Sequence, residues 1–129
     1  MTDRTSAIKA RDLEKKIREG IARFGLTLAP GAYFKGLSGK SPRCCAVGGA
    51  LAFSVNTKAA LMSINRSGVD TYSAPAAIGN GLTMAQARGL EVGFEKWVPE
   101  HWAPFDWSFY RLGRKLRREA DAKAKEGRK

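Results

Sequence analysis

The sequence is poor in residues that bind metals or form disulfides: it has one histidine, His101, and two cysteines, Cys44 and Cys45. With one histidine, no His–Cys or His–Asp cluster can be assembled, and zinc ligation has too few candidates. The cysteines are adjacent, and neighbouring residues close only a strained ring, so we expect reduced core thiols in a reducing compartment. We therefore expect no metal, no cofactor and a structural role for both cysteines.

Long apolar segments are also missing. The longest uncharged apolar run, Cys44 to Phe53, has about half of the roughly 20 residues that cross a bilayer. The first five residues contain no apolar segment of the signal-peptide kind. We therefore expect a cytoplasmic protein with no membrane partner. At 129 residues and 43% apolar composition, the chain is expected to form a single domain over residues 1–129.

Acidic residues are scarce, because 12 Asp and Glu stand against 23 Lys and Arg, and the formal net charge is +11. This excess goes beyond what solubility needs and makes a polyanion the first partner to consider. Among the few acids, Glu91 and Glu95 lie four residues apart and could face one site. The alternative, which we favour, is that both are solvent-exposed partners for Arg88 and Lys96. No nucleophile accompanies them and we identify no small-molecule substrate, so we expect a protein that is not an enzyme.

Apolar periodicity predicts a mainly α-helical domain of about five helices with a small β-hairpin near Tyr33. The expected helices cover about residues 5–24, 44–54, 58–65, 84–98 and 105–125. Thr83 and Gln86 form a capping box that should begin the fourth helix, and Gly25 should end the first. Small residues within 46–53 should let a neighbouring backbone approach closely, so we expect this stretch at the centre of the core.

One segment resembles a known group of proteins. A helix is followed by Gly-Ala-Tyr-Phe at 31–34, a glycine turn, and Cys-Ala-Val-Gly-Gly-Ala-Leu at 45–51. Over about residues 17–53 this order is similar to small uncharacterised proteins of bacterial genomes and their phages that carry a Cys-Ala-x-Gly-Ala signature, with one extra glycine here. The resemblance supplies no catalytic residues. It implies a small accessory protein, in a bacterial host cell if it is phage-borne, rather than a metabolic enzyme.

The last predicted helix separates into two faces. Its core face comprises Phe105, Phe109, Leu112, Leu116 and Ala120. The opposite face carries Trp107, Arg111, Arg114 and Arg118, with Lys115 adjacent. Guanidinium groups four, seven and eleven residues after a tryptophan could follow a phosphate backbone while the indole stacks on a base. The alternative is a solvated amphipathic helix whose Trp107 packs against Trp102 or Pro104. Gly113 favours the functional interpretation, because a purely structural helix would prefer alanine there.

Two functions follow from this helix. The leading expectation is a non-enzymatic protein that docks its C-terminal basic helix on nucleic acid or a nucleoprotein. The alternative is a phage-type inhibitor of a host protein or bacterial defence complex, anti-CRISPR-like, anchored by an aromatic cluster, since Trp and Tyr dominate protein interfaces. That cluster comprises Trp97, Trp102, Trp107 and Tyr110. Residues 121–129 are expected to be a frayed basic tail.

Overall fold

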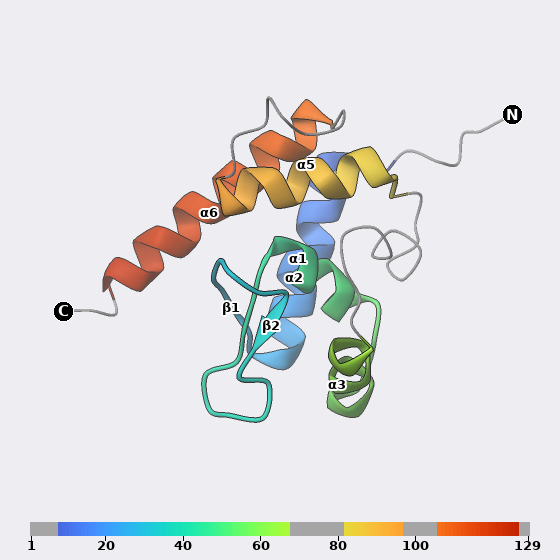
Figure 1. Cartoon of the computed structure of the whole chain (residues 1–129), viewed down its shortest axis with the longest axis vertical. Helices are drawn as coiled ribbons and strands as arrows, with labels where there is room; N and C mark the ends of the chain where they lie inside the picture. Colours follow the sequence, from blue (N-terminus) through green and yellow to red (C-terminus); the bar gives the residue numbers. More distant parts are fainter. Residues whose placement is uncertain (1–7, 68–81, 97–105, 127–129) are drawn as a thin grey trace, which may run out of the picture.

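Helices dominate the computed structural model, which describes residues 8–67, 82–96 and 106–126. The helices are α1 (Ala10–Phe24), α2 (Ala46–Phe53), α3 (Lys58–Arg66), α5 (Met84–Glu95) and α6 (Trp107–Glu126). The strands are β1 (Thr27–Leu28), β2 (Phe34–Lys35) and β3 (Arg43–Cys44). Figure 1 shows α5 and α6 stacked at one end of the molecule, with α3 and the small sheet toward the other. The predicted mainly α-helical fold with a little β-structure is confirmed.

The small sheet is more elaborate than the predicted hairpin. Its order is β1-β3-β2, with β2 antiparallel and β1 parallel to the central strand β3. The prediction that the second helix begins at Cys44 is wrong, because Cys44 lies in β3 and its carbonyl accepts the Ala29 N–H at 2.9 Å. Cys45 is the N-cap of α2, and its sulfur accepts the Gly48 N–H at 3.4 Å. Pairing with two strands therefore holds Cys44 in an extended conformation.

The centre of the core is α2, as its uncharged sequence predicts. Every residue from Ala46 to Ala52 is buried. Close approach to α1 occurs at Gly20 and Gly49: a Cβ on Gly20 would lie 2.5 Å from the Gly49 carbonyl oxygen and 2.6 Å from the Phe53 nitrogen. Small side chains on both helices thus allow their backbones to touch.

A second glycine contact joins α5 and α6. A Cβ on Gly113 would overlap the Leu90 carbonyl oxygen and approach the Phe94 nitrogen to 2.7 Å. Gly89 and Gly93 on α5 are equally close to the backbone of α6. Our interpretation of Gly113 as a mark of function is therefore wrong, because this glycine is needed for the two helices to pack. The predicted core residues Phe109, Leu112, Leu116 and Ala120 are buried, and Phe105 lies outside the described residues.

The helix ends follow their sequence signals in part: α5 ends at Glu95, where Lys96 adopts the left-handed conformation, rather than at the predicted residue 98. Gly25 adopts the left-handed conformation, with φ of 62°, that ends α1. Thr57 and Thr83 begin α3 and α5 as N-caps. The first helix begins at Ala10 rather than at residue 5 or 6; Lys9 is extended, and the Ile8 carbonyl accepts a hydrogen bond from the Gln86 side chain at 3.2 Å. At the other end of the chain, α6 is helical through Glu126, and the fraying of the tail stays a prediction.

The capping box of α5 leads to a stability prediction. Thr83 Oγ1 accepts the Gln86 N–H at 3.1 Å, and Gln86 Oε1 accepts the Thr83 N–H at 2.9 Å. Removing the hydroxyl in Thr83→Ala should lower the free energy of unfolding by about 1 kcal/mol. Urea denaturation measures this change, and Thr83→Ser, which keeps the hydroxyl, should remain close to the wild type. An unchanged midpoint for Thr83→Ala would show that this cap does not stabilise the helix.

Candidate nucleic-acid interface

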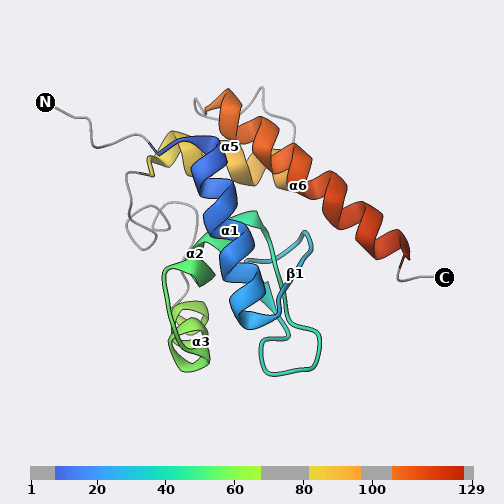
Figure 2. The same ribbon diagram turned by 180° about the vertical axis from the view of Figure 1, so that it is seen from behind.

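The outward face of α6 is defined by what the rest of the helix contacts. One side packs on α5 through Gly113, and Arg117 on this side donates to the Phe94 carbonyl at 2.8 Å. Another side meets α1 through Lys115 and Glu119. Figures 1 and 2 show α6 running diagonally across the top of the molecule, with its C-terminal part extending beyond the other helices. One sector of α6 therefore faces away from both α5 and α1.

This outward sector carries the predicted residues, which we call the α6 stripe: Trp107, Arg111, Arg114 and Arg118. Trp107 is 56% exposed, Arg111 and Arg118 are exposed, and Arg114 is half-buried. Within the described part of the chain, none of the three arginines forms an ion pair. Their helical rise separates them by about 4.5 and about 6 Å along the axis. The stripe is thus a row of available guanidinium groups with an indole at one end.

Acidic side chains near the stripe are already engaged. Asp121 accepts a hydrogen bond from Arg117 at 2.9 Å, and this bond lowers the pKa of Asp121. Glu119 receives both terminal nitrogens of Arg18, at 3.0 and 2.9 Å. Because these carboxylates are paired with other cations, they neutralise the three stripe arginines less than the sequence suggests.

Lys115 differs from the other predicted site residues because it points toward α1. Its ammonium donates to Glu14 Oε2 at 2.9 Å, beside the Arg18–Glu14 pair at 2.7 Å. Burial raises the pKa of Glu14, but the hydrogen bonds from Lys115 and Arg18 outweigh it, and the net shift is downward. Lys115 therefore joins α6 to α1, and a phosphate would have to compete with Glu14 to bind it.

The aromatic residues of the alternative interface are described only in part. Trp107 and Tyr110 form an edge-to-face pair with ring centroids 5.2 Å apart and planes at 69°. Tyr110 is half-buried beside α5 and packs against the indole. Trp97 and Trp102 lie outside the described residues, as does His101. Of the predicted cluster, the structure brings together Trp107 and Tyr110.

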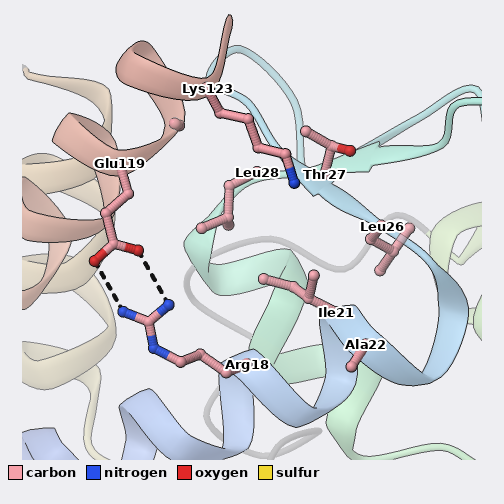
Figure 3. Close-up of a pocket in the computed structure, with 9 residues that line it drawn as sticks. Arg18, Ile21, Ala22, Leu26, Thr27, Leu28, Glu119 and Lys123 are labelled. Atoms are coloured by element: carbon pink, nitrogen blue, oxygen red, sulfur yellow. Dashed lines mark hydrogen bonds and ion pairs between the residues drawn. The ribbon is translucent and has the colours of Figure 1, made fainter. Parts of the chain in front are cut away.

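A pocket of about 250 Å³ opens where α1, β1 and α6 meet. Figure 3 shows Ile21, Leu26 and Leu28 lining it, with the Arg18–Glu119 pair on one side and the Lys123 side chain extending from α6 toward Thr27. The Arg18 charge is balanced by Glu119, so the rim is not strongly cationic. Sequence reasoning did not predict this pocket, because its walls come from residues far apart in the chain.

The carboxylates of α5 also have a role that the sequence did not reveal. Glu91 accepts the Tyr33 hydroxyl at 3.1 Å, and Glu95 accepts the Gly31 N–H at 3.1 Å. Both are half-buried, so the expectation that they are solvent-exposed is wrong. Burial raises the pKa of Glu95, although the Gly31 N–H acts in the opposite direction. The two side chains attach the segment before β2 to α5.

The thiols are buried and form no disulfide. Burial raises the pKa of Cys45 to about 12 and raises that of Cys44 as well, so thiolate chemistry at neutral pH is disfavoured.

Among residues 8–67, 82–96 and 106–126, no three His, Cys, Asp or Glu side chains are grouped as a metal site would require. In the same ranges, no helix is both long and apolar enough to span a bilayer.

Comparisons with known proteins identified no relative of this chain. No protein-family model matches the chain, and no curated protein or solved structure is detectably similar to it. The resemblance of residues 17–53 to small bacterial and phage proteins stays a prediction. The geometry of α6 and its neighbours is therefore the basis on which a function can be proposed.

Proposed function

We propose that this protein binds nucleic acid, free or within a nucleoprotein, through the α6 stripe. The observation that carries the proposal is the row formed by Arg111, Arg114 and Arg118, none of which forms an ion pair within the described residues. Arginine presents a planar fork of donors that matches phosphate oxygens, and the formal net charge of +11 attracts a polyanion from a distance. No chemical step is involved, so the protein acts by binding alone.

Trp107 has a separate task in this proposal. It lies at the first position of α6, is 56% exposed, and packs against the ring of Tyr110. An indole held in this way can stack on an unpaired base, while the arginines farther along the helix contact the phosphates. The protein would then distinguish nucleic acid from other polyanions by stacking.

The main test is the salt dependence of binding by the intact protein. Binding that rests on phosphate contacts should weaken steeply between about 50 and about 200 mM salt, because counterions are released. An interface anchored by Trp107 and Tyr110 on a host protein should be nearly independent of salt. Retention of a host protein at high salt after nuclease treatment, with no oligonucleotide bound at low salt, would favour the inhibitor function over nucleic-acid binding.

Replacing the indole tests the stacking role. Trp107→Ala should weaken binding of a single-stranded oligonucleotide by about 1–3 kcal/mol. The slope of log K against log[salt] should remain that of the wild type, because stacking releases no counterions. Fluorescence titration at several salt concentrations measures both quantities, and Trp107→Phe, which keeps an aromatic face, should recover part of the affinity. Equal affinities for Trp107→Ala and wild type would exclude a stacking role.

A further inference from the structure

The surface beside the α6 stripe contains a second pair of cations, on α1. Arg11 and Lys15, which we call the α1 pair, are both exposed. Within the described residues neither forms an ion pair. From the sequence alone this face of α1 is expected to be solvated, because it mixes cations with Asp12, Glu14 and Glu19. In the folded protein, some charged side chains of α1 contact α6 and others contact α2.

The order of side chains around α1 places the α1 pair next to α6. Leu13 and Ile17 are buried in the core, and the adjoining sector carries Glu14 and Arg18, which reach α6. The following sector around the helix, farther from the core, carries the α1 pair, and Lys15 also lines a hollow with Asp12 and Phe53 on the side of α2. Arg11 also lines a pocket with Ser108 and Phe109 at the beginning of α6.

Other charges of α1 are directed elsewhere. Lys16 and Arg23 lie over the Phe53 ring on the side of α2, with 4.5 and 5.5 Å to its centroid. Glu14 forms ion pairs with both Lys115 and Arg18. Figure 2 shows α1 and α6 beginning close together and diverging toward their C-terminal ends. The solvent side of their contact is thus bordered by two rows of cations, one on each helix.

Two rows of cations, one on each helix, match the two phosphate backbones of a duplex better than the one backbone of a single strand. A single strand presents one row of phosphates, which the α6 stripe can accommodate alone. A B-form DNA duplex presents two rows across a groove about 6 or about 12 Å wide. Helices in direct contact have axes about 8–10 Å apart, and α1 and α6 approach each other where both begin, beside Arg11. Cations on both helices can therefore reach phosphates of both strands at one groove.

We infer that the protein also binds double-stranded nucleic acid, with the α6 stripe on one backbone and the α1 pair on the other, in addition to single strands that offer an unpaired base to Trp107. The inference rests on the proposed function and extends it from a single helix to two. It makes the α1 pair a determinant of preference for paired over unpaired strands. Because the rows contact backbones, DNA and RNA duplexes share the recognised chemistry, and both are used in the test.

The test compares Arg11→Glu/Lys15→Glu with the wild type and with the control Lys35→Glu/Lys40→Glu. The control makes the same change of charge at exposed residues of β2 and the following loop, which lies at the far end of the molecule from the beginning of α6. Each protein is titrated with one strand, unpaired or annealed to its complement. For the duplex, losing two contacts should flatten the salt slope by about 1.8. Between about 50 and about 200 mM salt, wild-type affinity should then fall about tenfold more than that of the variant.

Each outcome bears on the inference. Loss of duplex affinity with single-strand affinity at the control level supports it. Equal losses for both ligands, or no loss for either, overturn it. If the α1 variant binds normally but reversal of the three stripe arginines abolishes binding, the proposed function stands and only the second row is wrong. If neither variant loses binding, both proposals fail. Circular dichroism checks folding, and Arg11→Gln/Lys15→Gln replaces the variant should glutamate unfold it.

Discussion

Reversing Arg111, Arg114 and Arg118 to glutamate is expected to abolish retention of nucleic acid at moderate salt. Each arginine that contacts a phosphate contributes about 0.7–0.9 to the slope of log K against log[salt], so losing three should flatten it by about 2–3. The new carboxylates would also repel the backbone. Gel-shift titrations over a range of salt concentrations measure the loss of affinity and the change of slope together.

The fold should tolerate this triple reversal. None of the three arginines forms an ion pair within the described residues, and glutamate has about the same helix propensity as arginine. A matched control reverses three exposed lysines on other elements, Lys35, Lys40 and Lys58, with the same change in net charge. Binding by the control but not by the stripe variant locates the interface on α6. Unchanged retention by the stripe variant would refute nucleic-acid binding through α6 and leave the arginines as a solvated rim.

Gly113→Ala should destabilise the protein, although alanine is the better helix former. In an isolated helix the substitution would be favourable by about 1 kcal/mol. Here the added methyl group meets the backbone of α5 at Leu90 and Phe94, which cannot rotate away as a side chain can. Overpacking typically costs about 1–3 kcal/mol, and the contact with backbone should place this site toward the upper end. We expect a net loss of stability in urea denaturation.

Gly39→Ala provides the control for that substitution. It adds the same methyl group where the nearest atom, the Gly36 carbonyl oxygen, is 3.5 Å away, which is ordinary van der Waals contact. Its effect on stability should be small. A Gly113→Ala protein more stable than the wild type would mean that α5 and α6 can separate at low cost. The glycines of their contact would then have no packing role.

The ion pairs between α1 and α6 should make the free energy of unfolding fall at acid pH. The folded-state pKa of Glu14 lies below its usual value, so the stability it contributes is present above the unfolded pKa of about 4.3. That contribution is lost as pH falls through the folded pKa. Glu14 is partly exposed to solvent, which screens the interaction. Attachment of α6 to α1 should therefore loosen only in acid, outside the range in which binding is measured.

Local signals were enough to determine several features from the sequence alone. The capping box at Thr83, the glycine end of α1 at Gly25 and the buried face of α6 are all as predicted. Each depends on residues no more than a few turns apart, so the spacing of side chains along a helix is sufficient information. The exposed stripe on α6 was predictable for the same reason, because it is the complement of the buried face.

Tertiary structure decided the features that depend on distant residues. Cys44 is extended because it pairs with β1 and β2, and Gly113 is required because α5 lies against it. Lys115 is directed to Glu14, 101 residues away, and so away from the α6 stripe. No local pattern encodes such partners, since they meet only when the helices pack. The same packing brings the cations of α1 beside those of α6, and a row on one helix becomes a surface shared by two.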